Sequence, residues 1–204
     1  MKSNLTKHLF TGICFALSLA LQAGAQTDAT NAPVGKPVSL PFVVYSDTGS
    51  PSNHYIPSGW MGNTKAAKMN EACQAQPHSG RTCIRCEYSD PGEWVGVVWQ
   101  DPANDWGDVK GGWNLTGAKK LTFWVRGDKG GETVSFKFGL LGVDKKFPDS
   151  GVGGLEAVVL TRDWKQYTID LSDKDLSCIK TGFAWTLTGQ GSPVVFYLDD
   201  IAFE

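Results

Sequence analysis

Short strand patterns separated by turns constrain this chain more than any other feature of its sequence. In residues 121–126 every second side chain is aliphatic or aromatic (Leu121, Phe123, Val125), and 132–138 repeats this pattern with Val134, Phe136 and Phe138. A period of two is typical of a half-buried β-strand. Further strands are predicted at 40–45, 65–73 (or a helical turn there), 82–88, 93–100, 156–160, 164–171, 182–188 and 194–203. Glycine-rich turns separate many of them, and no stretch has sustained helical spacing. Roughly nine or ten strands without crossover helices predict an all-β fold, an antiparallel β-sandwich.

The first 25 residues have the pattern of a secretory signal peptide. Lys2 and Lys7 precede an apolar run from Leu9 to Leu21, and the small residues of 23–25 offer a site for signal peptidase. The apolar run is too short to span a membrane comfortably. We therefore expect a mature protein that is secreted or periplasmic and has no membrane contact after cleavage.

The mature chain has the size of one domain and a mild negative charge. Residues 26–37 are polar and contain proline, which predicts a disordered linker, and 38–204 is long enough for one domain with a full core. Loss of the signal peptide removes two lysines and no acid, so the formal net charge falls from −2 to −4. Without a basic run, binding to a nucleic-acid backbone is not expected. The sequence carries no signal of oligomeric state.

Four cysteines remain after cleavage, namely Cys73, Cys83, Cys86 and Cys178. An even number in an exported protein indicates disulfides, with three possible connectivities. In an extended strand Cys83 and Cys86 point to opposite faces. We therefore favour a Cys73–Cys83 disulfide across the intervening turn, with a zinc site at the C-x-x-C pair as the alternative.

Residues for hydrolytic chemistry are hard to find in this sequence. Only His54 and His78 remain in the mature chain, and both fall in predicted loops. Asp199 and Asp200 are adjacent, so a regular strand would point them apart, unlike the acid pair of a retaining glycosidase. Neither G-x-S-x-G nor H-E-x-x-H occurs. The sequence favours a non-catalytic protein, with a small polysaccharide-processing hydrolase or lyase as the alternative.

The chain has eight tryptophans, more than a core of this size needs, because tryptophan is seldom fully buried. A tryptophan exposed beside glycine presents a flat apolar face that matches a sugar ring, while a place at the end of the core is the alternative. Val95, Val97 and Trp99 share one strand face, which predicts that Trp94 and Gln100 point outward. The candidate stacking residues are Trp60, Trp94, Trp106, Trp113 and Trp124, and their candidate polar partners are Gln100, Asn104 and Lys137.

Two of these candidates depend on strand pairing. Trp124 and Lys137 lie on the polar faces of successive predicted strands, and they would line one surface patch if those strands pair. A solvated face with one aromatic residue is the alternative. Pairing of the terminal strands would likewise bring Asp47 toward Asp199 and Asp200. Carboxylates at a strand end suit calcium, and a solvated strand edge is the alternative there.

Three segments resemble carbohydrate-binding modules with the galactose-binding-like jelly-roll fold. They are 115–127, with the sequence LTGAKKLTFWVRG, 164–171, with WKQYTIDL, and 196–201, with FYLDDI. The resemblance spans about residues 40–204, and it implies a jelly roll and a structural calcium near the terminal strands. We expect a secreted, non-catalytic protein that binds polysaccharide or oligosaccharide by tryptophan stacking and polar hydrogen bonds. A cell-surface protein-interaction module is a further alternative, and it would show an exposed apolar patch.

Overall fold

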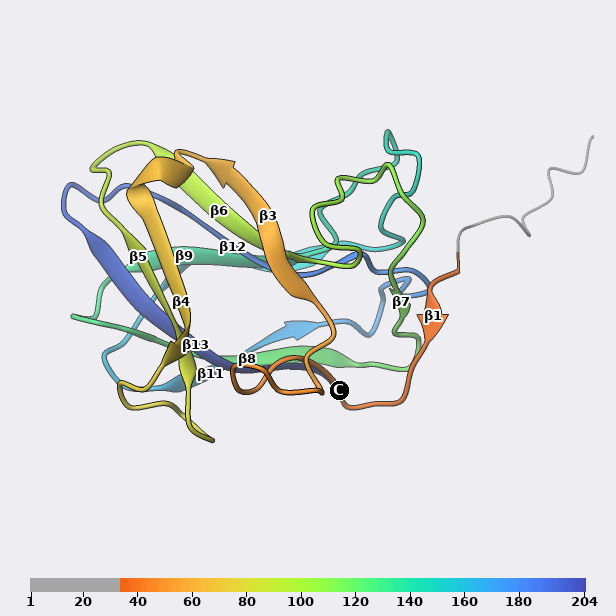
Figure 1. Ribbon diagram of the computed structural model, residues 1–204, viewed down its shortest axis with the longest axis horizontal. Helices are drawn as coiled ribbons and strands as arrows, with labels where there is room; N and C mark the ends of the chain where they lie inside the picture. The colour runs from red at the N-terminus through yellow and green to blue at the C-terminus, as the bar shows by residue number, and fades with distance from the viewer. Residues whose placement is uncertain (1–33) are drawn as a thin grey trace, which may run out of the picture. The chain divides into compact units, whose positions relative to one another are not determined.

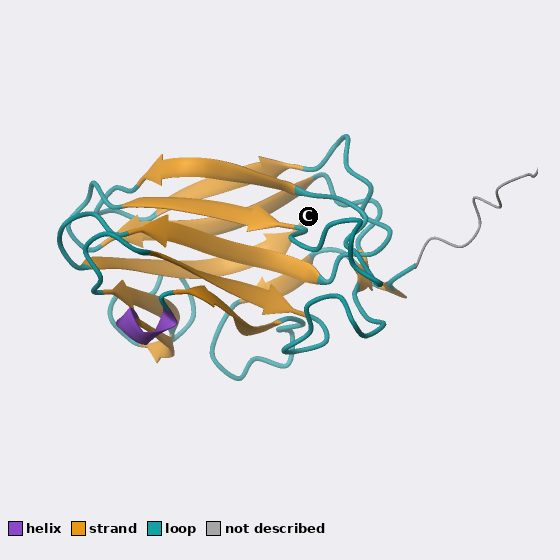
Figure 2. Cartoon of the chain, turned by 90° about the horizontal axis from the view of Figure 1, so that it is seen from above, coloured by secondary structure: helices purple, strands orange, loops and turns teal. Residues whose placement is uncertain are grey.

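The computed structural model describes residues 34–204, so the predicted signal peptide and most of the predicted linker lie outside the described residues. The described part is almost entirely β, as predicted, and its strands form two antiparallel sheets. Figure 1 shows the two layers, and Figure 2 shows the strands running between loops at both ends. The predicted β-sandwich is therefore confirmed. No helix within 34–204 is long and apolar enough to cross a membrane.

The first sheet has five strands. Its order is β10 (Gly153–Val159), β9 (Thr133–Phe138), β12 (Thr181–Thr188), β6 (Trp94–Gln100) and β3 (Ile56–Gly62). Both of its outer strands are irregular. β10 shifts register against β9 between Leu155 and Val158, and β3 shifts register against β6 between Pro57 and Gly59.

The second sheet has six strands. Its order is β11 (Lys165–Asp170), β8 (Lys120–Gly127), β13 (Val194–Phe203), β5 (Cys83–Tyr88) and β4 (Ala67–Cys73), and β2 (Phe42–Tyr45) also pairs with β13. A single 3-10 turn, η1 (Thr64–Ala66), precedes β4, so the segment predicted as strand or helical turn contains both. Outside the two sheets, β1 (Lys36–Pro37) pairs with β7 (Trp113–Asn114).

Alternating residues of both sheets meet in one core. Phe123 of β8 and Phe136 of β9 lie 4.7 Å apart between ring centroids, and Trp185 of β12 meets the ring of Phe196 of β13 edge-on at 5.2 Å. These contacts join the inner faces of the two sheets. The polar side chains that alternate with these aromatic residues are left on the two outer faces.

The segment around Trp60 forms strand β3, which is missing from the strands predicted above because its proline and glycines hide its strand pattern. The last two residues of the predicted linker, Lys36–Pro37, form the short strand β1. Cys73 and Cys83 lie directly opposite each other on β4 and β5, as the predicted pairing requires, yet both are thiols in this structure. The predicted disulfide is therefore not formed here.

Candidate functional site

The outer face of the five-stranded sheet carries a floor of small side chains. Val95, Val97 and Trp99 of β6 are buried in the core, so Trp94, Gly96 and Val98 face outward. The register places Gly96 between Met61 of β3 and Thr186 of β12. A Cβ added at Gly96 would lie 2.8 Å from the methyl group of Thr186 and 3.0 Å from that of Met61. The glycine therefore keeps this part of the face low.

A groove of about 470 Å³ opens over one half of this face. The groove is lined by one aromatic ring, by hydroxyl and amide groups and by some aliphatic surface, from Trp94, Thr133, Ser135, Ala157, Thr186, Leu187, Thr188, Gly189 and Gln190. Trp94 is 47% exposed, whereas Trp99 on the same strand is 1% exposed, so the prediction of their opposite orientations is confirmed. An exposed indole beside hydroxyl and amide groups offers both an apolar face and hydrogen-bonding partners.

The amide of Gln190 is held in place on the groove wall. Its Oε1 accepts a hydrogen bond from the backbone N–H of Thr133 at 3.0 Å, and its Nε2 donates to the carbonyl of Thr133 at 2.9 Å. This paired contact fixes the orientation of a side chain that follows the last residue of β12. A polar group that is already oriented loses little conformational entropy when a ligand binds.

An ion pair borders the groove on the β10 side. Nζ of Lys137 lies 2.6 Å from Oε1 of Glu156 in an adjoining hollow of about 240 Å³. Hydrogen bonds from Lys137 and from Ser135 hold the pKa of Glu156 below its usual range. Since the two charges compensate each other, this edge of the groove presents polar atoms but little net charge.

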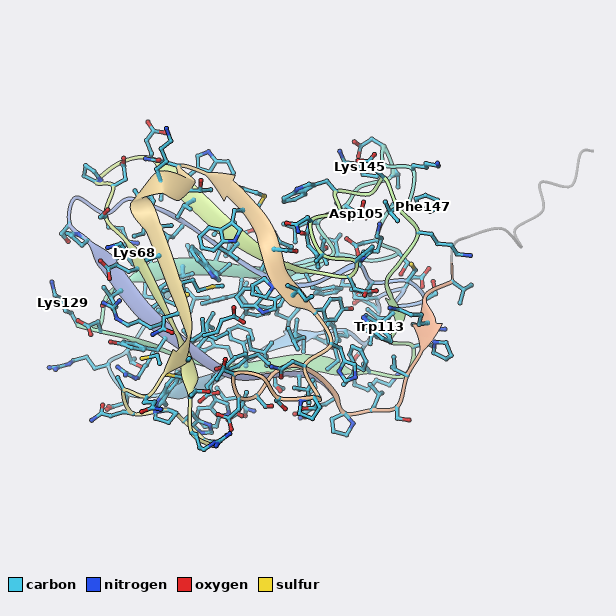
Figure 3. All side chains as sticks on the ribbon, in the orientation of Figure 1. Lys68, Asp105, Trp113, Lys129, Lys145 and Phe147 are labelled. Atoms are coloured by element: carbon cyan, nitrogen blue, oxygen red, sulfur yellow. The ribbon has the colours of Figure 1, made fainter. Side chains whose placement is uncertain are left out.

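Two loops, 101–112 and 139–152, stand at the other end of the same sheet. Figure 3 shows Asp105, Lys145 and Phe147 close together in this pair of loops, and the N–H of Phe147 donates to the carbonyl of Gly107 at 2.9 Å. Val98 and Ala184 belong to the outer face of the sheet, yet both are 0% exposed. Side chains outside the sheet therefore cover this half of the face, and the groove is confined to the half beyond it.

A buried lysine fixes loop 101–112 to the start of β12. Lys180 is 1% exposed, and its Nζ donates to the carboxylate of Asp105 and, at 2.6 Å, to the carbonyl of Val109. The carboxylate of Asp105 also accepts the N–H groups of Asp108 and Val109, both at 3.0 Å. Burial opposes ionisation of Asp105, but these hydrogen bonds outweigh burial and hold its pKa below the usual range.

The structure places Trp94 and Lys137 on this one face, while Gln100 and Asn104 lie at its covered end. Gln100 is 1% exposed, because its amide binds the hydroxyl of Ser58 at 2.8 Å and the carbonyl of Asp105 at 2.7 Å. Contact between Gln100 and a sugar stays a prediction, and this burial does not support it. Asn104 is exposed, and its N–H donates to Ser58. Trp106 is half-buried in the same loop, and its role stays a prediction.

The remaining predicted tryptophans lie elsewhere. Trp60 is 38% exposed, but it pairs in register with Val97 and so is directed to the opposite face of the sheet from the groove, at the β3 edge. Trp113 packs against the ring of Phe42 at 5.1 Å and carries the ammonium of Lys36 at 3.7 Å. These contacts occupy part of the ring of Trp113, so stacking of a sugar on Trp113 stays a prediction that the geometry does not support.

Trp124 and Lys137 do not share a patch, and that prediction is wrong. Trp124 lies on β8 of the six-stranded sheet and Lys137 on β9 of the other sheet, and both side chains alternate with core residues. The two residues therefore lie on opposite outer faces. The ring of His78 stacks on Trp124 at 3.7 Å with an interplanar angle of 16°.

The three predicted calcium ligands bind the loop that carries His78. Oδ1 of Asp47 accepts the N–H groups of Arg81 and Thr82, and Oδ2 of Asp199 accepts the N–H of His78 at 2.9 Å. Asp200 binds the imidazole of His78 at 2.7 Å. Because these carboxylates already accept protein donors, the arrangement does not fit a calcium site, and within 34–204 no three such groups cluster around a common point. Calcium stays a prediction that the geometry does not support.

Several groove residues were not predicted. Thr133 and Ser135 belong to the polar face of a strand that the sequence reveals, so their outward orientation was available from the alternation. Thr186 and Thr188 likewise alternate with the core residues of β12. The sequence has no signal, however, for which two strands flank β12, and the position of Gln190 depends on that neighbourhood.

Comparisons with known proteins agree with this architecture. No protein-family model matches the chain, and no curated protein matches it. Among solved structures, the family 30 carbohydrate-binding module of the cellulosomal cellulase Cel9D-Cel44B of Clostridium thermocellum is 14% identical, with a TM-score of 0.55 over 81% of this chain and 98% of that one. Another structure of a family 30 module gives 14% identity and a TM-score of 0.56, over 81% and 99% of the two chains.

A third solved structure is the family 11 module of the cellulosomal cellulase Lic26A-Cel5E of Clostridium thermocellum. It is 14% identical, with a TM-score of 0.50 over 79% of this chain and 92% of that one. The chain therefore has the jelly-roll β-sandwich fold of carbohydrate-binding modules. At this level of identity the likeness defines the fold, and function has to be argued from the site.

Proposed function

We propose that this chain is a secreted, non-catalytic carbohydrate-binding protein that holds an oligosaccharide, or a stretch of polysaccharide, in the groove beside Trp94. The observation that carries the proposal is the 47% exposed ring of Trp94 in a groove that also holds four side-chain hydroxyl groups and one amide. A sugar has the complementary surface, with an apolar C–H face and a rim of hydroxyls. The fold shared with carbohydrate-binding modules supports the same function.

Each part of the groove has a role in this proposal. Trp94 provides the stacking surface, and Gln190, already oriented by Thr133, accepts from a ligand hydroxyl through the remaining lone pair of its Oε1. Ser135 and Thr186 add hydroxyls to the floor, where Gly96 leaves room for a ring to approach the sheet. The compensated Lys137–Glu156 pair offers further hydrogen bonds at the edge.

The contribution of Trp94 follows from its exposed area. A fully covered tryptophan side chain buries about 200 Å², so covering an exposed half removes about 100 Å² from water, or about 2.5 kcal/mol at ~25 cal/mol per Å². The Trp94→Ala substitution is therefore expected to weaken glycan binding roughly 60-fold. Because Trp94 lies outside the core, the variant should keep its melting temperature within about 2 °C.

The test is a binding screen of the purified protein against soluble and insoluble polysaccharides, with isothermal titration for each ligand retained. Trp60→Ala is the matched control, because it removes another exposed tryptophan that faces away from the groove. Equal binding by Trp94→Ala and the unaltered protein would overturn the groove assignment. Release of sugar products into the supernatant would favour a polysaccharide-processing enzyme, and no retention on any glycan would favour a protein partner.

A further inference from the structure

A second hollow lies on the outer face of the six-stranded sheet, on the other side of the sandwich from the groove. Its volume is about 170 Å³, and its wall and rim include Ser46, Thr122, Trp124, Gln166, Asp200 and Glu204. We call this hollow the Trp124 pocket. Its floor is low, because Val43 and Ala202 lie opposite each other on β2 and β13.

The strand register explains why these side chains meet. Gln166 of β11 lies directly opposite Trp124 of β8, and Thr122 lies opposite Ala202 of β13. Residues that are directly opposite in an antiparallel pair point to the same face. The Trp124 pocket is therefore built mainly on four strands of one sheet, β2, β8, β11 and β13, rather than on a loop.

A β-bulge brings a carboxylate to the rim. β13 shifts register between Asp199 and Ala202, and Asp200 has a φ of 46°, in the left-handed region. A residue other than glycine adopts this conformation at a cost of about 1 kcal/mol or more. The carboxylate of Asp199 is consequently buried at 0% exposure, whereas Asp200 is half-buried and lines the pocket. Bulges that redirect one side chain are frequent beside binding sites.

The wall and rim of the pocket are held by their neighbours. His78 stacks on the ring of Trp124 at 3.7 Å, and its Nδ1 lies 2.7 Å from the carboxylate of Asp200. On the other side, Glu204 accepts a hydrogen bond from Thr122 at 3.0 Å and pairs with Lys120 at 2.8 Å. The aromatic ring and both carboxylates are thus oriented before any ligand arrives, which lowers the entropic cost of binding.

We propose that the Trp124 pocket is a second carbohydrate subsite that takes a single uncharged sugar residue. Trp124 adds apolar surface to the wall beside the stacked ring of His78, and the exposed amide of Gln166 can donate and accept. Asp200 and Glu204 can each accept a further hydrogen bond from a ligand hydroxyl, because a carboxylate has about four lone-pair sites and their protein donors use only part of them. Its volume is about 170 Å³ against about 470 Å³ for the groove, which matches one sugar residue rather than a chain segment. The carboxylates of Asp200 and Glu204 on the rim disfavour a uronate or a sulfated sugar.

The proposal rests on the proposed function only for the class of ligand, since the Trp124 pocket and the groove share no residue. Its consequence is that one molecule can contact two glycan segments on opposite faces. Such bivalent contact raises apparent affinity for a dense or insoluble glycan without any new contact in the groove.

The test is a titration of the isotopically labelled full-length protein followed by nuclear magnetic resonance. The probes are β-1,4-linked trisaccharides of glucose and of galactose, with trigalacturonic acid as the charged comparison. The reporters are the indole N–H of Trp124 and the amide of Gln166 for the pocket, and the indole N–H of Trp94 and the amide of Gln190 for the groove. We expect a neutral probe to move both sets, and the charged probe to leave the pocket set unmoved.

Variants separate the two sites. Gln166→Ala, at an exposed position of β11, should weaken the pocket response at least tenfold and leave the groove response unchanged, and Trp94→Ala should do the reverse. Thr168→Ala, on the same face of β11 but outside the pocket lining, should change neither. If the signals of the pocket residues do not shift when the groove is saturated, the inference of a second subsite is overturned and the proposed function stands. If the signals of the pocket residues shift but those of the groove residues do not, the proposed function of the groove is overturned and the second subsite stands. If neither group of signals shifts, both proposals are overturned.

Discussion

Replacement of Lys180 by methionine is expected to destabilise the protein strongly. Methionine retains most of the apolar stem but removes the ammonium that binds Asp105 and the carbonyl of Val109. Asp105 is only 7% exposed, so its carboxylate would be left buried without a compensating charge. Removing one partner of a buried ion pair costs about 3–5 kcal/mol. For a chain of this size that corresponds to a melting temperature lower by about 10 °C.

The assay is thermal unfolding of four proteins, namely the unaltered chain, Lys180→Met, Asp105→Asn and the double variant. The double variant leaves no unpaired buried charge, so it should recover more than half of the stability lost in Lys180→Met. The single variant should also alter the pH dependence. Without Lys180, burial raises the pKa of Asp105, so the stability gap to the unaltered protein should narrow as the pH falls from about 7 toward 4.

Two outcomes would refute this reasoning. One is a loss of less than about 1 kcal/mol in Lys180→Met, which would place the pair in the range of exposed ion pairs. The other is a double variant no more stable than the single one, because the penalty would then come from lost packing around the lysine stem. A further readout is glycan affinity, which should change little in Lys180→Met, since the groove lies at the other end of the sheet from loop 101–112.

Two further predictions concern the six-stranded sheet. Cys73 and Cys83 lie opposite each other on β4 and β5, so we expect them to form a disulfide in the exported protein, detected by mass spectrometry without reduction. Replacement of both cysteines by serine should lower the free energy of unfolding by about 3 kcal/mol. A free thiol at Cys73 after export would contradict this prediction. Burial and the adjacent Asp200 raise the pKa of Asp199 to about 6. A carboxyl group whose pKa is higher in the folded state contributes stability that is present below about pH 4 and is lost as the pH rises through about 6. A carbon-detected titration of this carboxyl group should have its midpoint near 6, and a midpoint below about 4.5 would show that Asp199 is better solvated than the structure indicates.

Most strands could be predicted from local periodicity, because a strand with one buried face has apolar side chains at every second residue. Residues 121–126 and 133–138 show this, as does the contrast between Trp94 and Trp99. β3 was missed, since Pro57, Gly59 and Gly62 resemble a loop and their strand role depends on pairing with β6. The local sequence therefore indicates where a strand lies, but it does not indicate which strand pairs with it.

In the candidate site, too, local sequence predicted the direction of single side chains but not which residues come together. The sequence indicated that Trp94 points outward, but it gave no reason to separate Trp94 from the other candidate tryptophans. Trp124 and Lys137 are close in sequence, yet the chain crosses between sheets from β8 to β9, so they fall on opposite faces. Gln100 does belong to the outer face, but Ser58 and Asp105 consume its hydrogen bonds, and no local pattern reports such long-range partners.

The irregular outer strands of the five-stranded sheet limit edge-to-edge pairing with another molecule. A regular edge strand exposes a row of N–H and C=O groups on which another chain can form a strand. Here β10 is interrupted by its register shift and by Ala157 at a φ of 49°, and β3 is interrupted at Pro57, which has no N–H to donate. Neither edge offers a continuous ladder to a second molecule. A neighbouring molecule therefore finds no uninterrupted edge on this sheet along which its own strands could extend it.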